Sequence, residues 1–185
     1  AAVDFAPEPP PMKGTRLVLL GTRGGPGIDL SRAQTASVVV VDGVPYLVDC
    51  GYGTLRRLVE SHVDYLRVGE VFLTHLHDDH TADLPALLSF QWTNGRKGAT
   101  QVHGPQGTAQ LVEGAIASFR GNVEIRTVDE GRTLKPEQLY RGQDIPATGA
   151  AVVAYKDERV TVTAVENAHY PARSTARTAR ASRAA

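Results

Sequence analysis

The pattern of apolar and polar positions along the chain predicts an α/β fold. Short apolar or β-branched runs are typical of strands, whereas apolar residues at helical spacing between charged ones predict helices. The expected strands are Arg16–Leu20, Ser37–Val41, Pro45–Val48, Val71–Thr74, Gln101–His103, Val123–Val128, Ala151–Tyr155 and Val160–Val165. The expected helices are Thr54–His62, Asp83–Trp92 and Gly107–Phe119. Strands that alternate with helices, together with hairpins, indicate an α/β domain with mixed sheets.

Turn residues add two hairpins to this picture. Asp42-Gly43 separates two strand-like runs, and this pair tolerates the positive φ of a type I′ turn. Asp157-Glu158 lies between two later runs and predicts a second hairpin. Between Gly131 and Gly149 the pattern predicts no clear element.

The composition changes sharply at both ends of the chain. Residues 1–13 are rich in proline, which predicts a flexible lead-in. Residues 171–185 consist mainly of Ala, Ser, Thr and Arg, which cannot form a core and predict a disordered tail. A single domain is therefore expected over residues 14–170.

The overall charge bears on the partners, the single cysteine on disulfides, and the N-terminal residues on the compartment. The 20 basic and 20 acidic residues balance, which argues against nucleic acid as a partner, and no apolar run predicts a membrane span. Cys50 is the only cysteine, so an internal disulfide is excluded. The small residues at the N-terminus favour a secreted or periplasmic protein after signal removal, with a cytoplasmic protein as the alternative. A homo-oligomer is left open.

A cluster of histidines and aspartates follows directly after the apolar run Val71–Thr74. Its sequence is His75-Leu76-His77-Asp78-Asp79-His80. A strand end holds the chain rigidly, so a tight loop can aim His75 and His77 at one point and Asp79 and His80 at a second. Imidazole and carboxylate are ligands that suit Zn²⁺, at about 2.0–2.2 Å. The alternative is a solvated polar loop, which so dense a histidine cluster makes the weaker interpretation.

The spacing His75-x-His77-x-Asp79-His80 resembles the signature of the metallo-β-lactamase superfamily. Further similarities to its ribonuclease Z and arylsulfatase-like branch are Leu20-Gly-Thr-Arg-Gly-Gly-Pro26, Val48-Asp-Cys-Gly-Tyr-Gly53 and Thr74-His-Leu-His-Asp-Asp-His-Thr-Ala-Asp-Leu-Pro85. The similarity runs in order from about residue 14 to residue 170. It implies an αββα sandwich with mixed sheets, of which the second half is largely missing here.

The resemblance also implies a set of metal ligands. His75 and His77 would hold a first ion, with His169 as the third ligand in a loop after a late strand. Asp79 and His80 would hold a second ion, and Asp79 would in addition act in catalysis by orienting the attacking water. Asp49 would support the metal loop from behind, although a turn or helix cap is an equal interpretation of this residue. One or two Zn²⁺ ions are expected, with Mn²⁺ as an alternative.

Two departures from the family pattern affect the expected function. After Tyr170 the sequence contains no aspartate, glutamate or histidine, so the family's bridging aspartate and last histidine have no counterpart. This predicts a truncated chain, or one whose missing half comes from another chain. The resemblance implies a zinc-dependent hydrolase that uses a metal-bound hydroxide on a small-molecule ester, either a phosphodiester or a sulfate ester rather than a carboxylic ester or lactam. The alternative is an inactive metal-binding remnant.

Overall fold

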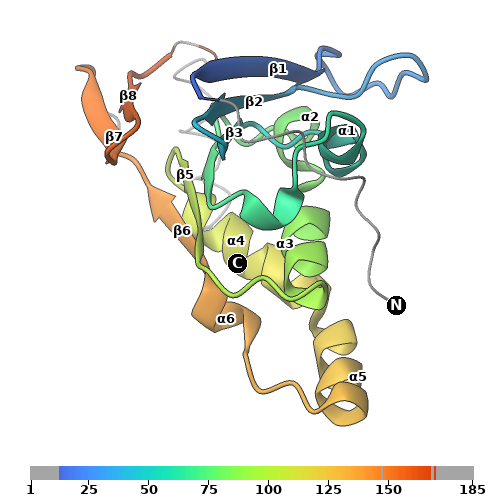
Figure 1. Cartoon of the computed structure of the whole chain (residues 1–185). Coiled ribbons are helices and arrows are strands. Elements are labelled where there is room, and N and C mark those ends of the chain that lie inside the picture. Colours follow the sequence, from blue (N-terminus) through green and yellow to red (C-terminus); the bar gives the residue numbers. More distant parts are fainter. Residues whose placement is uncertain (1–12, 147, 168, 170–185) are drawn as a thin grey trace, which may run out of the picture.

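The computed structural model describes residues 13–146, 148–167 and 169, and a six-stranded mixed sheet dominates it (Figure 1). Across the sheet the strands are β1 (Thr15–Gly21), β2 (Ala36–Val41), β3 (Val44–Val48), β4 (Glu70–Phe72), β5 (Thr100–Gly104) and β6 (Tyr140–Asp144). The first three strands pair antiparallel, and the pairs β3–β4, β4–β5 and β5–β6 are parallel. A separate antiparallel hairpin is formed by β7 (Val152–Lys156) and β8 (Thr161–Ala164).

Helices connect the parallel strands. They are α1 (Thr54–Glu60), the 3-10 helix η1 (Tyr65–Arg67), α2 (Asp78–Thr81), α3 (Leu84–Thr93), α4 (Thr108–Ser118), α5 (Arg120–Glu130) and α6 (Pro136–Leu139). Parallel strands require such crossovers, because a tight turn can only join antiparallel neighbours. In the part of the chain that the structure describes, no helix is long and apolar enough to span a bilayer.

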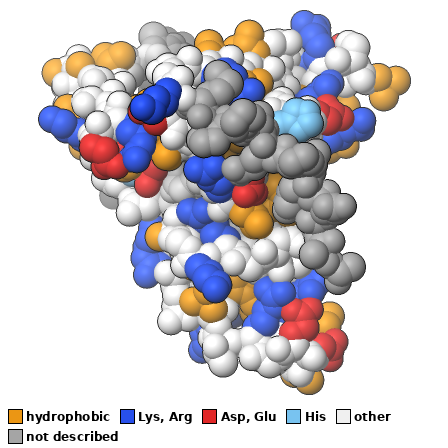
Figure 2. Space-filling model, in the orientation of Figure 1, with side chains coloured by type: hydrophobic (Ala, Val, Ile, Leu, Met, Phe, Trp, Pro, Cys, Tyr) orange, Lys and Arg blue, Asp and Glu red, His pale blue; other side chains and the backbone are white. Residues whose placement is uncertain are grey.

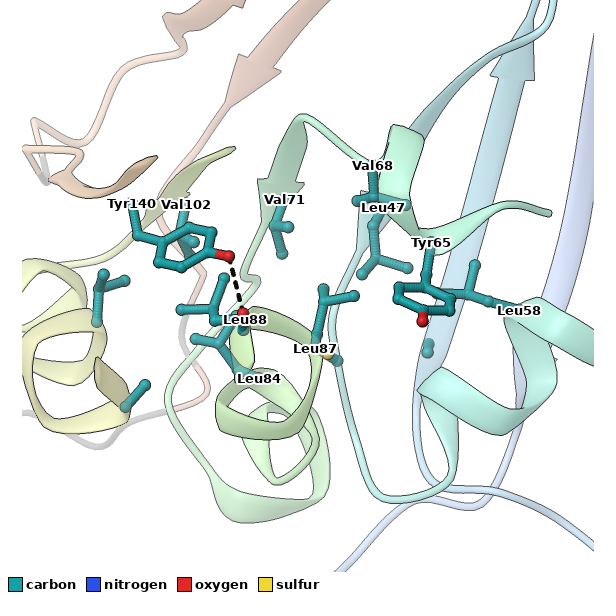
Figure 3. Packing of buried hydrophobic residues seen from close by; sticks show 14 of the residues in the cluster. Leu47, Leu58, Tyr65, Val68, Val71, Leu84, Leu87, Leu88, Val102 and Tyr140 are labelled. Atoms are coloured by element: carbon teal, nitrogen blue, oxygen red, sulfur yellow. Dashed lines mark hydrogen bonds between the residues drawn. The ribbon is translucent and has the colours of Figure 1, made fainter. Parts of the chain in front are cut away.

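One face of the sheet carries the hydrophobic core. Neighbouring strands place one apolar row on this face, formed by Val18, Val38, Leu47, Val71 and Val102. Leu84, Leu87 and Leu88 of α3 pack against this row, and the hydroxyl of Tyr140 donates to the carbonyl of Leu88 at 2.8 Å (Figure 3). Each fully buried aliphatic side chain of this kind stabilises the fold by about 1.5–3 kcal/mol. The core therefore fixes the strand register that positions the histidine loop.

The opposite face of the sheet is covered differently. Leu17 and Leu19 of β1 point to this face and are exposed by 61% and 64%. Near β4 and β5 the hairpin β7–β8 approaches the same face, where the ring of Tyr155 contacts Phe72 and His103. The helices thus lie on one side of the sheet and the hairpin on the other (Figure 1).

Most of the expected elements are confirmed. The Asp42-Gly43 turn joins β2 to β3, with φ values of 47° and 79° at its two residues, as a type I′ turn requires. The second expected hairpin is β7–β8. The α/β class with a mixed sheet is also confirmed. The expected domain limits stay predictions, because residues 1–12 and 170–185 lie outside the described ranges.

One expected strand is wrong, and one strand was missed. The run Val123–Val128 lies within the helix α5, whose side chains pair at helical spacing, as in the ion pair of Arg126 with Glu130. Gly131, with φ 65°, ends this helix. The missed strand is β6, which carries no apolar alternation and has Gly142 on its core-facing side.

Candidate metal centre

The histidine loop begins where β4 ends. The backbone of Leu73 donates to the carbonyl of His103 on β5, and Asp49 after β3 donates to the carbonyl of Phe72. These bonds extend the pairing of three parallel strands just past their ends, so the following residues leave the sheet at a fixed place. His77 is extended and precedes the single turn of α2, which contains Asp79 and His80.

A turn after β3 supports this loop from beneath. The backbone N–H of Cys50 donates to the carbonyl of His80 at 2.7 Å, and the N–H of Asp83 donates to the carbonyl of Cys50 at 2.9 Å. Gly51 lies so close that a Cβ atom there would stand 2.2 Å from the carbonyl oxygen of Asp79. Only glycine permits this approach, which explains the glycine in the segment that follows β3.

Three imidazoles form a first group of candidate ligands. His75, His77 and His169 each offer a nitrogen, and these atoms all lie within 4.8 Å of one another. Nε2 of His75 is 3.1 Å from Nδ1 of His77, and Nε2 of His169 is 3.3 Å from the same atom. Two nitrogens bound to one tetrahedral Zn²⁺ at about 2.05 Å would stand about 3.3 Å apart. The spacing therefore fits a shared zinc ion.

Asp79 and His80 form a second group together with His75, again with ligand atoms within 4.8 Å of one another. Nε2 of His80 is 3.6 Å from Oδ2 of Asp79. The same Oδ2 accepts a hydrogen bond from the backbone N–H of Gly25 at 2.6 Å. The two groups are adjacent and share His75, whereas the sequence assigns His75 to the first ion alone.

The outward-facing nitrogens of two imidazoles have hydrogen-bond partners. Nδ1 of His80 is 2.8 Å from Oδ2 of Asp49, and Nδ1 of His75 is 3.1 Å from the hydroxyl of Thr74. This hydroxyl in turn donates to the Asp49 carboxylate, which also accepts the Thr74 N–H at 2.8 Å. Such partners fix the tautomer of an imidazole and direct its other nitrogen toward an ion.

Burial keeps the central imidazole in the form that binds metals. His75 is 7% exposed, and this burial lowers its pKa, assisted by the neighbouring rings of His80, His169 and His77. A lowered pKa favours the neutral imidazole, which is the ligand form. The donor set and its electrostatics thus agree with a cation site.

The structure brings all the expected ligands together and places Asp78, His103 and His62 outside the two groups. Asp78 is exposed, and its carboxylate accepts the backbone N–H of Asp79. His103 is buried on the far face of the sheet, where its Nε2 lies 2.7 Å from Glu70. His62 is exposed, with φ 57° in the turn after α1.

Three residues at the site were not expected from the sequence. They are Thr74, Gly25 and Asp83, whose Oδ2 accepts the N–H of Leu55 at 3.0 Å at the start of α1. Each acts through a hydroxyl, an N–H or a helix-end contact that depends on the fold. The only signal in the sequence was their position inside or beside the segments that carry the family resemblance.

The comparisons with known proteins agree with this geometry. The family model described as the metallo-beta-lactamase superfamily matches residues 31–164. Ribonuclease Z of Mycolicibacterium gilvum is 36% identical over 113 residues, which are 60% of this chain and 39% of that protein. Ribonuclease Z of Picrophilus torridus is 32% identical over 121 residues, which are 63% and 39% of the two chains. The matched segment thus spans well under half the length of these relatives.

Solved structures share the fold. Human tRNase Z, short form, has a TM-score of 0.57 and 23% identity, with 80% of this chain and 59% of that chain covered. The metallo-beta-lactamase fold protein YhfI of Bacillus subtilis has a TM-score of 0.54 and 18% identity, with 77% and 49% covered.

Two expectations about partners and compartment are contradicted by these relatives. The balanced charge predicts that nucleic acid is not a partner, and this prediction is wrong, because the relatives are ribonucleases. Their name also contradicts a secreted or periplasmic protein, because RNA is made and processed inside the cell. Net charge is a poor guide to binding of nucleic acid here, because it averages over a surface on which acidic and basic side chains are interspersed (Figure 2).

Proposed function

The chain belongs to the metallo-beta-lactamase superfamily, and we propose that it carries the zinc site of a hydrolase that cleaves phosphodiester bonds in RNA. The observation that supports this most directly is the convergence of five side chains at the ends of parallel strands. Two of these side chains, His75 and Asp79, are nearly buried. The relatives named ribonuclease Z favour RNA over a sulfate ester as the substrate class.

The donors in the two groups suggest how ions would be held. His75, His77 and His169 would bind one zinc ion, and Asp79 and His80 would bind a second. A bound divalent ion lowers the pKa of a water molecule and stabilises the negative charge that develops on a phosphoryl group. Nitrogen-rich donors suit Zn²⁺ better than Mg²⁺, which prefers oxygen ligands.

Asp79 is the residue to which we assign the orientation of the attacking water. Its Oδ2 accepts a hydrogen bond from the N–H of Gly25 at 2.6 Å, which restricts rotation of the carboxylate. We assign Oδ1 to accept a hydrogen bond from the water, so that an oxygen lone pair of the water points at phosphorus. The water would then form the new P–O bond, the bond to the leaving oxygen would break, and the released proton would pass through Asp79.

Hydrolysis of bis(p-nitrophenyl) phosphate and of a short RNA by the zinc-loaded chain tests this function. We expect turnover that depends on zinc, and a fall in kcat of about 100-fold in Asp79→Asn, as is typical when a positioned proton acceptor is lost. Asp78→Asn is the matched control, because its side chain is exposed and should leave kcat within about twofold. Equal activity of the two variants would contradict the role of Asp79.

A second candidate is a chain that binds metal without turnover. The observation that favours it is the composition of the second group, in which Asp79 and His80 are the only described ligands besides the shared His75. Metal stoichiometry measured beside turnover separates the two. About two zinc ions per chain with hydrolysis supports the enzyme, whereas one ion or fewer without hydrolysis supports the second candidate.

Asp49 is expected to strengthen the site without touching the ion. In Asp49→Asn the charge that holds His80 and Thr74 is lost, so zinc affinity should fall by about 10- to 100-fold. Asparagine tolerates the positive φ of 59° at this position, which limits backbone effects. The matched control is Asp42→Asn, since Asp42 also has a positive φ and lies in an exposed turn. Chelator competition measures both affinities, and an unchanged value in Asp49→Asn would refute this role.

A further inference from the structure

The hairpin β7–β8 contacts the sheet through a small group of aromatic side chains. The ring of Tyr155 lies 5.8 Å from that of Phe72, 5.5 Å from that of His103 and 6.3 Å from that of Tyr46, measured between centroids. Aromatic pairs at these distances and tilts attract one another beyond the burial of their surface. This contact joins an otherwise separate two-stranded hairpin to β3, β4 and β5.

Asp157 connects the turn of the hairpin to the same group. Its Oδ1 accepts the backbone N–H groups of Arg159 and Val160, both at 2.7 Å, and so holds the turn together. Its Oδ2 accepts the hydroxyl of Tyr46 at 2.5 Å and that of Tyr155 at 3.1 Å. One carboxylate thus fixes the hairpin turn and ties it to β3. We call Tyr46, Tyr155 and Asp157 the tyrosine–aspartate cluster.

The pKa values of this cluster keep its hydrogen bonds in place over the physiological pH range. Although burial acts to raise it, the hydrogen bonds from Tyr46, the turn and Tyr155 lower the pKa of Asp157 to about 2. Burial, the negative charge of Glu70 and the hydrogen bond to Asp157 raise the pKa of Tyr155 to about 12. The acceptor is therefore ionised and the donors are protonated across the physiological range. A hydrogen bond to a charged group is stronger than one between neutral groups.

The position of the hairpin bears on the metal centre through His169. Strand β8 ends at Ala164, and His169 follows five residues later. Five residues span at most about 17 Å, so the end of β8 limits where this imidazole can lie. The ring of His169 packs at 4.4 Å from His75 and 5.1 Å from His77, between centroids. His169 is the candidate ligand that comes from outside the His75–His80 loop.

We propose that Tyr46, Tyr155 and Asp157 are positioning residues for the metal centre: by holding β7–β8 on the sheet they place His169 against His75 and His77. This inference rests on the zinc site of the proposed function, and it adds residues that touch neither the ion nor the substrate. Because the tyrosine–aspartate cluster already holds the hairpin, less conformational entropy is lost when His169 binds zinc.

The test is the zinc affinity of the full chain with Tyr46→Phe, measured by chelator competition. The substitution keeps the ring and removes only the hydroxyl that donates to Asp157. We expect zinc affinity to fall by about tenfold, in the range found for residues that orient a ligand. In a His169→Ala background the same substitution should change affinity by less than about twofold, because the ligand that it positions is already gone.

A control variant separates positioning from general stability. Tyr65→Phe removes a tyrosine hydroxyl that accepts a hydrogen bond from Asn94 at 2.9 Å, on the helix-covered side of the sheet. It should lower Tm but leave zinc affinity unchanged. Tyr155→Phe, which loses the second hydroxyl of the cluster, should behave like Tyr46→Phe.

The possible results distinguish the inference from the function on which it rests. A parent chain that binds no zinc would overturn the zinc site and the positioning role together. If the parent binds zinc and His169→Ala weakens it, an unchanged affinity in Tyr46→Phe overturns the positioning role alone. An equal loss from Tyr46→Phe with and without His169 also overturns it, because the effect would not pass through that ligand.

Discussion

Replacing His75 and His77 together with alanine is expected to abolish zinc binding while leaving the fold intact. Loss of a residue that only orients a ligand costs about 10- to 100-fold in affinity, so loss of two ligands should cost more than about 10,000-fold. His75 belongs to both groups of candidate ligands, and the variant therefore disrupts both. Metal content after dialysis against a weak chelator, measured by atomic emission, gives the result.

The control for this variant is another histidine of the same chain. His62 is exposed in the turn after α1, and His62→Asn keeps a residue that tolerates its φ of 57°. This variant should retain the parent's zinc content. The double-alanine chain should unfold, free of metal, within a few degrees of the metal-free parent, since the removed imidazoles lie at a loop and not in the core. Zinc retained by the double variant would refute the ligand assignment.

How far the fold could be predicted depended on how each element is buried. Strands β2 and β3 are joined by an Asp-Gly turn and place Val38 and Leu47 on the core face. The pattern of apolar residues in the sequence therefore agrees with the packing in the fold. Strand β6 has no such pattern. Its core-facing residues are Tyr140, at the start of the strand, and Gly142, where a Cβ atom would stand 2.5 Å from the Cα of Ala109 in α4. At Gly142 the backbone of α4 packs directly against the strand, where an apolar side chain would otherwise lie. The sequence therefore shows no apolar residue at this position.

The failure at α5 has a different cause. Alternation over Val123–Val128 resembles a strand, but a strand needs a neighbour with free backbone groups. In the part of the chain that the structure describes, this segment pairs with no strand, and none of the residues of α5 is buried. Local side-chain pairs four residues apart, such as Asn122 with Arg126, then decide in favour of a helix. Short alternating runs are ambiguous for this reason.

For the candidate metal centre, the sequence predicts candidate ligands but not the residues that support them. Five candidate ligands follow from the dense histidine loop and from the resemblance that pointed to His169. Thr74 acts through a hydroxyl and Gly25 through its backbone N–H. Hydroxyl side chains are common and every residue except proline carries an N–H, so neither group marks its residue in the sequence. Only the register of β3 beside β4 shows that Thr74 lies between Asp49 and His75.

Gly51→Ala is expected to destabilise the protein and to impair its zinc site at the same time. The added Cβ atom would stand 2.2 Å from the carbonyl oxygen of Asp79, 2.8 Å from Cβ of Gln34 and 2.9 Å from the backbone nitrogen of Thr35. Two of these three atoms belong to the backbone, so relief requires movement of the histidine loop or of the strand that begins at Ala36. Overpacking of this kind costs about 3 kcal/mol in the free energy of unfolding, which corresponds to a fall in Tm of roughly 10 °C for a domain of this size.

The same substitution at Gly114 supplies the control. Gly114 lies within α4, and a Cβ atom there would meet nothing within 4 Å. Because alanine is favoured over glycine in a helix by about 1 kcal/mol, Gly114→Ala should raise Tm slightly and leave zinc affinity unchanged. Calorimetry of both variants, with and without zinc, measures the two effects separately. A Gly51→Ala chain with the parent's Tm and zinc affinity would mean that the turn after β3 does not support the histidine loop. In that case the glycine would have to be explained by a different constraint.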